Sequence, residues 1–169
     1  MKKLLLLTSI AVLLSSCAEK QTEIAKAKLD IVPVPQTMIV NPIENAFILN
    51  DKTVIVYDND ANQFNAEFLQ SYLKNIFKKD LKIHVEAYGR MSESKTLNTI
   101  NLNIVDASKC KELGLANDNE AYVLSVSLDN IDIYALDAAG IFYGIQTLIQ
   151  MMPNDIYSKD ATKIAGVDI

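Results

Sequence analysis

Tryptophan is absent from this sequence of 169 residues, and histidine occurs only once, as His84. A single histidine excludes a histidine-pair metal site and leaves no pattern for a catalytic triad. His84 lies between Ile83 and Val85 in a predicted strand, so we interpret it as a structural or solvent-facing residue. The zinc motif H-E-x-x-H and the calcium motif D-x-[DN]-x-[DN]-G are also missing. The sequence therefore predicts no metal site and no cofactor.

Cysteine is nearly absent, since only Cys17 and Cys110 occur. Cys17 closes the run LSSC at residues 14–17, which follows the basic start at 1–3 and an apolar stretch over 4–14. This order of charge, apolar run and small residues is typical of a bacterial lipoprotein signal. We predict cleavage before Cys17 and lipidation of its thiol. Cys110 would then have no intramolecular partner, so no disulfide is expected.

The predicted organisation of the chain begins with a lipoprotein signal peptide over residues 1–16 and a lipidated tether over 17–29. One folded domain is expected over 30–155, and 156–169 is interpreted as a linker. The expected localisation is outside the cytoplasm. There the lipid would anchor the protein in a membrane, on the periplasmic or cell-surface side of the outer membrane.

Positive charge is in the minority, because 16 lysines and arginines stand against 21 acidic residues, a net charge of −5. Removal of residues 1–16 would take away two lysines and leave 14 basic residues, a net charge of −7. An acidic surface repels phosphate backbones. We therefore expect no binding to nucleic acid.

Alternating and β-branched segments predict a sheet. The segment 99–105 alternates apolar residues with asparagines, and two further alternating segments flank Asp129 and Asn130, a pair that suits a hairpin turn. The segment 53–57 is almost continuously apolar, which predicts a central strand covered on both faces. The predicted strands are 38–40, 46–49, 53–57, 82–87, 99–105, 122–128 and 131–135.

Two amphipathic segments predict helices. The first follows Asp60, the expected N-cap, with Gln63 reaching back to it. Its apolar stripe is expected to consist of Phe64, Phe68, Leu69, Tyr72, Leu73 and Ile76. The second covers 138–152, with Asp137 as N-cap and Pro153 after its end.

Two glycines lie four residues apart on one side of the second helix, Gly140 and Gly144. Each costs about 1 kcal/mol of helix propensity relative to alanine, so we expect them to mark a close approach of the helix to the sheet. The order of strands and helices predicts an α+β fold, with a mixed, largely antiparallel sheet and helices packed on one face.

Cys110 and a set of acidic residues are the remaining candidates for chemistry. Lys109 and Lys111 flank Cys110 and are expected to lower its pKa modestly, but no base is near in sequence, so nucleophilic catalysis is not expected. The acidic residues gather near expected turns, where turn chemistry explains them better than calcium binding. They are Asp58, Asp60, Asp118, Glu120, Asp129 and Asp132.

Three segments resemble the end of the first domain of family 20 glycoside hydrolases, the β-N-acetylhexosaminidases. They are NEAYVLSV at 119–126, IDIYA at 131–135 and DAAGIFYGIQTL at 137–148, and the run IVPVPQ at 31–36 is similar to the start of that family. The run GIFYGIQTLIQ is the specific part of the resemblance. It implies a two-layer α+β unit, similar in fold to zinc proteases, that flanks a catalytic (β/α)8 barrel.

In that family the barrel carries an adjacent Asp-Glu pair: the Glu protonates the leaving oxygen, and the Asp orients the substrate's own acetamido nucleophile. This sequence contains no Asp-Glu dipeptide, and it has no tryptophan to line a sugar pocket. No catalytic residue is therefore carried over. The expected partner is a catalytic barrel downstream, toward which 156–169 would lead.

The sequence favours the non-catalytic N-terminal domain, as a fragment, of an exported β-N-acetylhexosaminidase that acts on glycans containing N-acetylhexosamine. One alternative is a self-standing lipoprotein that binds a glycan or another partner at the membrane. Missing tryptophan weakens the glycan version, because sugar rings stack on large aromatic faces. A stand-alone hydrolase is the third and least supported function.

Overall fold

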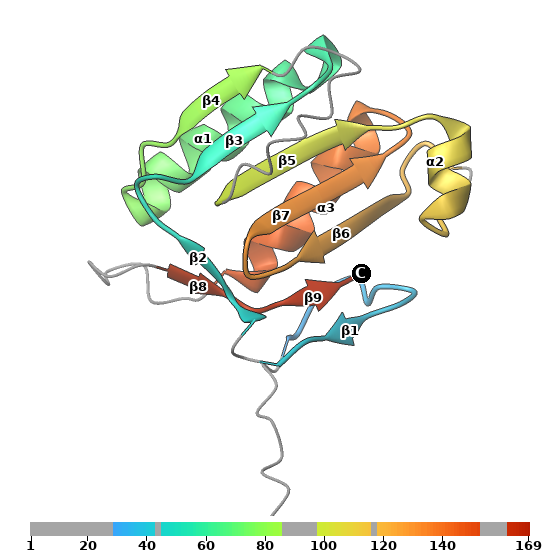
Figure 1. The fold of residues 1–169 in the computed structure, drawn as a ribbon, viewed down its shortest axis with the longest axis horizontal. Coiled ribbons are helices and arrows are strands. Elements are labelled where there is room, and N and C mark those ends of the chain that lie inside the picture. Colours follow the sequence, from blue (N-terminus) through green and yellow to red (C-terminus); the bar gives the residue numbers. More distant parts are fainter. Residues whose placement is uncertain (1–28, 43–44, 86–97, 116–117, 153–161) are drawn as a thin grey trace, which may run out of the picture.

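The computed structural model describes residues 29–42, 45–85, 98–115, 118–152 and 162–169, which form strands and helices (Figure 1). The strands are β1 (Ile39–Val40), β2 (Phe47–Leu49), β3 (Val54–Tyr57), β4 (Lys82–Val85), β5 (Thr99–Ile104), β6 (Tyr122–Val126), β7 (Asn130–Ala135), β8 (Thr162–Ile164) and β9 (Val167–Asp168). The helices are the short 3-10 helix η2 (Asp60–Asn62), α1 (Gln63–Phe77), α2 (Ala107–Glu112) and α3 (Ala138–Met151).

The large sheet has seven strands in the order β1-β9-β6-β7-β5-β3-β4, and β2 pairs with β8 in a separate two-stranded sheet. Strands β4, β3, β5 and β7 are mutually parallel, whereas β6, β9 and β1 join by antiparallel pairs. The predicted α+β class with a mixed sheet is confirmed. The parallel share is larger than predicted, because crossovers such as α1, between β3 and β4, return the chain to the same end of the sheet.

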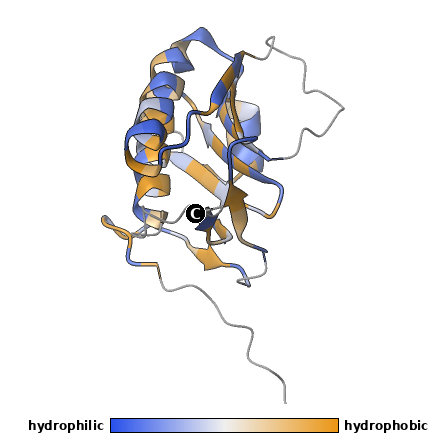
Figure 2. Ribbon diagram, turned by 90° about the vertical axis from the view of Figure 1, so that its left-hand side faces the viewer, coloured by the Kyte–Doolittle hydropathy of each residue, from blue (hydrophilic) through white to orange (hydrophobic). Residues whose placement is uncertain are grey.

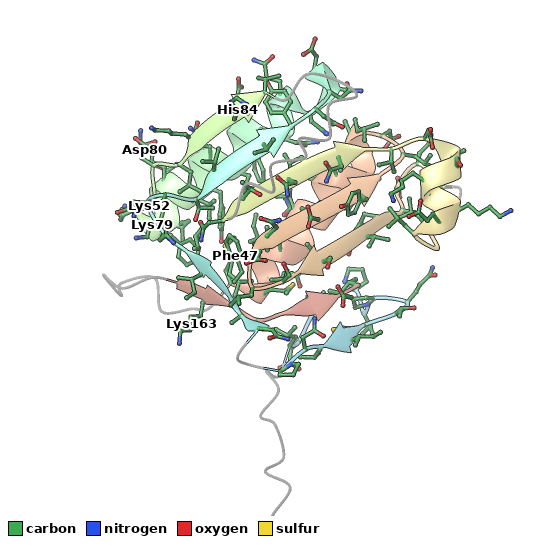
Figure 3. The ribbon with its side chains drawn as sticks, in the orientation of Figure 1. Phe47, Lys52, Lys79, Asp80, His84 and Lys163 are labelled. Atoms are coloured by element: carbon green, nitrogen blue, oxygen red, sulfur yellow. The ribbon has the colours of Figure 1, made fainter. Side chains whose placement is uncertain are left out.

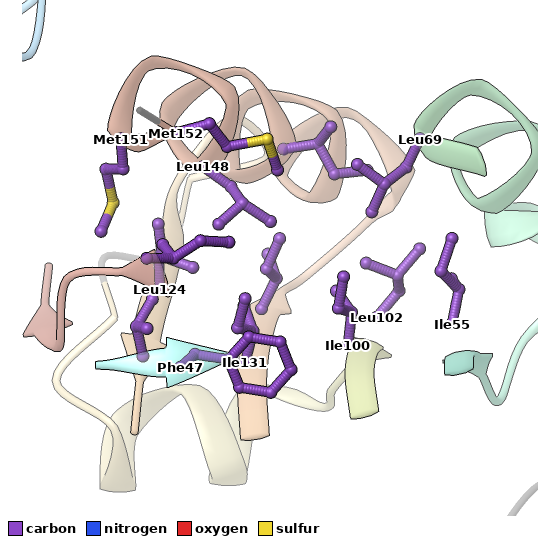
Figure 4. Packing of buried hydrophobic residues seen from close by; sticks show 14 of the residues in the cluster. Phe47, Ile55, Leu69, Ile100, Leu102, Leu124, Ile131, Leu148, Met151 and Met152 are labelled. Carbon is purple, nitrogen blue, oxygen red and sulfur yellow. The ribbon is translucent and has the colours of Figure 1, made fainter. Parts of the chain in front are cut away.

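Helices α1 and α3 cover one face of the large sheet, so the domain has two layers (Figure 2). Alternate residues of the central strands point into the space between the layers, and Leu102 of β5, Ile133 of β7 and Leu69 of α1 are fully buried there. Phe47 of β2 joins the same core (Figure 4). The segment 53–57 was predicted to be a central strand covered on both faces. It forms β3, which lies next to the edge strand β4, and its residue Val56 is only half-buried on the face away from the helices, so the prediction is wrong in this respect.

The start of α3 was predicted correctly. The Asp137 carboxylate accepts hydrogen bonds from the backbone nitrogens of Ala139 and Gly140, both at 3.0 Å. The predicted cap of the first helix was wrong. Asp60 lies inside η2, whose cap is Asn59, and α1 continues directly from that turn without a side-chain cap. The predicted hairpin between β6 and β7 is confirmed.

Residues 162–169 belong to the fold. Strand β9 lies between β1 and β6, and the backbones of Ile169 and Leu124 exchange two hydrogen bonds of 2.8 and 3.0 Å. The linker prediction is therefore wrong for this part of 156–169. The predicted signal peptide, Cys17 with nearly all of the tether, and Pro153 lie outside the described residues.

Candidate functional site

The first glycine of α3 brings the helix backbone against the sheet. A Cβ atom built on Gly140 would lie 2.5 Å from the carbonyl oxygen of Ala121 and 2.6 Å from the Cβ of Ala135. Real Cβ atoms do not approach other atoms so closely, and a backbone oxygen cannot rotate out of the way. The close helix-to-sheet contact predicted from the sequence is confirmed at this position.

The second glycine repeats the contact one turn later. A Cβ on Gly144 would lie 2.5 Å from a methyl group of Ile133 and 3.3 Å from the ring of Tyr122. The Tyr122 hydroxyl then reaches the hydroxyl of Thr147 on α3, with 2.6 Å between the two oxygens. The run GIFYGIQTLIQ, which carries the family resemblance, thus forms most of the helix that packs closely against β6 and β7. Its role here is structural.

The sheet face opposite the helices carries a row of polar side chains across β5, β7, β6 and β9. Asn101, Asp132, Ser125 and Asp168 are successive partners in the register of these strands. The Asn101 amide donates to the Asp132 carboxylate at 2.7 Å, and the Ser125 hydroxyl donates to the Asp168 carboxylate at 2.5 Å. Because these carboxylates accept bonds from neighbouring strands, the row acts as a cross-strand brace.

Tyr134 lies on this same face of the sheet, the open face opposite the helices, two residues after Asp132. Burial, followed by the negative charge of Asp132, raises the pKa of Tyr134 to about 12. Both effects disfavour the phenolate. Tyr134 therefore stays neutral at physiological pH and offers a hydroxyl donor but no base.

His84 is exposed on the edge strand β4 (Figure 3). Its register partner is Val56, which in turn pairs with Asn101. His84 therefore lies on the open face, in line with the row of polar side chains and at its β4 end. Of the two roles left open by the sequence, structural or solvent-facing, the exposed position agrees with the second.

Cys110 is 2% exposed within α2. Burial, and then the charge of Asp106, raises the pKa of its thiol above the ordinary value. The predicted lowering by the flanking lysines is wrong, because Lys109 pairs with the Glu112 carboxylate at 2.6 Å and the thiol is desolvated. A buried, neutral thiol is a poor nucleophile.

The acidic residues divide between turns and the sheet. Asp118 accepts a hydrogen bond from the backbone nitrogen of Glu120 at 3.2 Å, as expected at a turn. Asp132 does not follow the prediction, since it lies within β7 and joins the polar row. Within the described ranges, no group of three or more His, Cys, Asp or Glu side chains could hold a metal ion.

Comparison with known proteins identifies the family of this chain. Residues 28–169 match the family described as glycosyl hydrolase family 20, domain 2. The chain belongs to this family. Domain 2 of family 20 is the non-catalytic N-terminal region of β-hexosaminidases, in agreement with the resemblance seen in the sequence.

The relatives of this family 20 domain are much longer proteins. The β-hexosaminidase of Porphyromonas gingivalis (strain ATCC BAA-308 / W83) is 27% identical over 179 residues, a match that covers 100% of this chain and 21% of the relative. A family 20 β-N-acetylhexosaminidase from Streptomyces coelicolor A3(2) has a TM-score of 0.64 at 18% identity, over 85% of this chain and 27% of that one. An exo-β-N-acetylglucosaminidase from Vibrio harveyi has a TM-score of 0.61 at 20% identity, over 85% and 19%. The structural matches establish the fold.

Sequence reasoning missed an aromatic surface on the helix layer of this family 20 domain. Phe64 of α1 is 69% exposed and Tyr143 of α3 is 43% exposed. The rings of Phe68 on α1 and Phe142 on α3 are in contact, with centroids 5.5 Å apart, and the ring of Phe142 lies 6.0 Å from that of Tyr143. The predicted apolar stripe of α1 included Phe64 and Ile76, which are exposed, whereas Phe68 of the same stripe is partly buried against the core. The apolar residues of this segment spread over more than one helix face, and this spread was the sequence signal that some of them lie outside the core.

Proposed function

We propose that this family 20 domain is the non-catalytic N-terminal part of an exported β-N-acetylhexosaminidase that acts on glycans containing N-acetylhexosamine. The match to domain 2 over residues 28–169 carries the proposal. The curated relative supports it, because that protein bears the name β-hexosaminidase and this chain spans 21% of its length. A catalytic (β/α)8 barrel in the same polypeptide is the partner that completes the enzyme.

The contribution of this domain to such an enzyme is mechanical. Its core is apolar and its polar residues brace one another across strands, so it presents a rigid body to the barrel. The proton donor and the carboxylate that holds the acetamido group would come from the barrel.

Lipid attachment at Cys17 is the second part of the proposal. The order of basic residues, apolar stretch and small residues before Cys17 supports it. None of the helices in the described part of the chain is long and apolar enough to cross a membrane. Replacement of Cys17 by serine is expected to abolish incorporation of a clickable fatty acid in cells, because a hydroxyl does not form the thioether. Undiminished labelling of the variant would contradict the anchor.

The activity is tested with a chromogenic N-acetyl-β-glucosaminide. The purified 169-residue chain is expected to show no hydrolysis above background, whereas the product of the whole source gene is expected to hydrolyse the substrate. Turnover by the pure chain, lost on substitution of one of its own carboxylates, would contradict the non-catalytic assignment. A gene with no barrel-coding sequence after codon 169 would favour a self-standing lipoprotein instead.

A further inference from the structure

Most of the lysines in the described residues lie at one end of the domain. Lys109 and Lys111 are the exceptions, since they belong to α2, after the carboxyl end of β5. The other lysines lie where the parallel strands begin and α1 ends, and three of them are labelled in Figure 3. This group, called the basic end from here on, consists of Lys52, Lys74, Lys78, Lys79, Lys82 and Lys163.

Strand register and one side-chain bond place these lysines together. Lys82 begins β4 and is level with the first residues of β3 and β5. Lys52 lies in the turn that leads into β3. Lys163 of β8 pairs with Ile48 of β2, whose carbonyl oxygen accepts a hydrogen bond of 2.9 Å from the side-chain amide of Asn98, just before β5. Strand β8 is therefore held at the end where β3, β4 and β5 begin.

The first described residues lie at the same end. Helix α3 follows β7 and runs back along it, so the last turn of α3 lies where the parallel strands begin. Gln150 in that turn exchanges two hydrogen bonds with the backbone of Val32, at 2.9 and 3.0 Å. Val32 and Val34 are 75% and 82% exposed. The described part of the chain therefore begins beside the basic end, with two exposed aliphatic side chains.

Acidic residues dominate the rest of the domain. Four of them lie among the six lysines of the basic end, which leaves a net charge of +2 there. Two of the four are paired, Asp80 with Lys74 at 3.0 Å and Asp51 with Lys79 at 3.1 Å. The other described residues carry ten acidic groups against the two lysines of α2, a net charge of −8. The acidic residues of the basic end are Asp30, Asp51, Asp80 and Asp129.

This polarity determines which part of the domain approaches an anionic surface. The whole protein has a net charge of −5, so such a surface repels it on average. The repulsion is screened beyond about 8 Å at physiological ionic strength. Helix α3 has 14 residues and so separates the two ends of the domain by about 21 Å. With the basic end in contact, the acidic residues of the opposite end lie outside the range of repulsion, whereas the lysines lie inside the range of attraction.

We propose that the basic end binds the anionic headgroups of the membrane in which the lipid on Cys17 is anchored. The proposal rests on the lipid attachment proposed above. Only residues 18–28 separate Cys17 from the first described residue, Leu29, and a fully extended chain of this length reaches about 40 Å. The anchor therefore keeps the domain close to the headgroups, so a few lysines are sufficient for docking. Val32 and Val34 favour a lipid surface over a soluble polyanion, because apolar side chains enter the boundary between headgroups and acyl chains.

The experiment uses the mature, lipidated chain in two kinds of vesicle, one of phosphatidylcholine alone and one of equal parts phosphatidylcholine and phosphatidylglycerol. A water-soluble reagent acetylates exposed lysines, and mass spectrometry reads the rate at each position. Lys52, Lys82 and Lys163 are expected to react at least about threefold more slowly on the anionic vesicles, because headgroups cover them. Lys111, exposed on α2 at the opposite end, is the internal control and should keep its rate. Salt at about 1 M should remove the difference, since the Debye length falls to about 3 Å.

Docking and anchoring fail in different ways. If the chain carries fatty acid and Lys82 and Lys163 react equally fast on both kinds of vesicle, the docking is wrong and the lipid attachment stands. Slower reaction of Lys111 in place of the basic end would turn the domain the other way round and also overturn the proposal. Absence of fatty acid from the chain would remove the anchor and the docking together.

Matched variants test whether the charge of the basic end is responsible. One variant combines Lys52→Gln, Lys82→Gln and Lys163→Gln. Lys78, protected on anionic vesicles in the parent, remains as the reporter and should react equally fast on both kinds of vesicle in this variant. Lys111→Gln is the control and should leave Lys78 protected. The three replaced side chains are exposed, so the combined variant should melt at the temperature of the parent. Undiminished protection of Lys78 in the combined variant would contradict the proposal.

Discussion

The two faces of the large sheet use the same strands in opposite ways. In β5 and β7 the residues that face the helices are fully buried and apolar, as Leu102 and Ile133 are. Their immediate neighbours Asn101 and Asp132 are half-buried on the open face and hydrogen-bonded to each other. Burial of apolar area supplies stability on the first face, whereas the second contributes cross-strand bonds that each have a small net effect.

This difference indicates which positions of the domain tolerate substitution. On the helix-covered face, a Cβ added at Gly140 would meet the backbone of Ala121 and one added at Gly144 would meet the side chains of Ile133 and Tyr122, so added volume has no place to go. Among the described residues no helix covers the open face, and its polar side chains hydrogen-bond to one another. Substitutions on the first face should therefore cost much more than matched substitutions on the second.

The largest effect is expected for Gly144→Leu. The leucine side chain would collide with Ile133 and Tyr122, because even a Cβ atom at this position would lie 2.5 Å from a methyl group of Ile133. The free energy of unfolding should therefore fall by about 3 kcal/mol or more. Urea unfolding followed by circular dichroism measures it. Ala139→Leu, on the exposed side of the same helix, is the control and should change stability by less than about 0.5 kcal/mol. An unchanged midpoint for Gly144→Leu would show that α3 is not held against the sheet.

A matched pair in β5 tests the two faces directly. Leu102→Ala should cost about 2–5 kcal/mol because it leaves a cavity under the helices. Asn101→Ala, one residue away, removes a single bond to Asp132 and should cost about 1 kcal/mol. Equal losses from the two variants in the same unfolding experiment would mean that the faces do not differ in this way.

Alanine at the two glycines should separate backbone contact from side-chain contact. At Gly140 the added Cβ meets the carbonyl oxygen of Ala121, which is rigid, and we expect a loss of about 2 kcal/mol despite the better helix propensity. At Gly144 it meets a methyl group of Ile133, which can move, so the loss should be smaller. The reverse order of unfolding midpoints would contradict this reading of the interface.

The smallest effect concerns the open face at high pH. The pKa of Tyr134 is about 12 in the folded domain and close to its ordinary value of about 10 in the unfolded chain, so the unfolded state loses its proton first. Stability should therefore fall as the pH rises from about 10 to 12 and be unaffected by this group below that window. Tyr134→Phe should remove this part of the loss and also the highest step in a spectrophotometric tyrosine titration. A variant with the same alkaline stability profile as the parent would assign the loss to other groups.

The elements that the sequence predicts well are those with a local periodic signal. Alternation identified β5 and β7 and the faces of their residues, and Asp137 with the two glycines identified the start and the close packing of α3. Capping, alternation and missing side chains act between near neighbours in the chain. They can therefore be recognised without knowledge of the partners.

The exposed Phe64 of α1 shows where a local pattern becomes ambiguous. The apolar residues of α1 span more than one face, and the periodicity does not say which part turns toward the sheet. The structure buries Leu69 and Leu73 and leaves Phe64 exposed. The contact with β3 and α3, which comes from distant segments, decides this orientation.

Strand order and the place of residues 162–169 were decided by the tertiary structure alone. Strand β9 has two residues, Val167 and Asp168, and so few residues have no period of their own. It becomes a strand because its backbone bonds to β6, about 40 residues earlier, and to β1 at the start of the domain. The sequence by itself determined which segments are strands and helices where local energetics suffice. Hydrogen bonds between distant segments decided how those segments are ordered, because their formation depends on the whole fold.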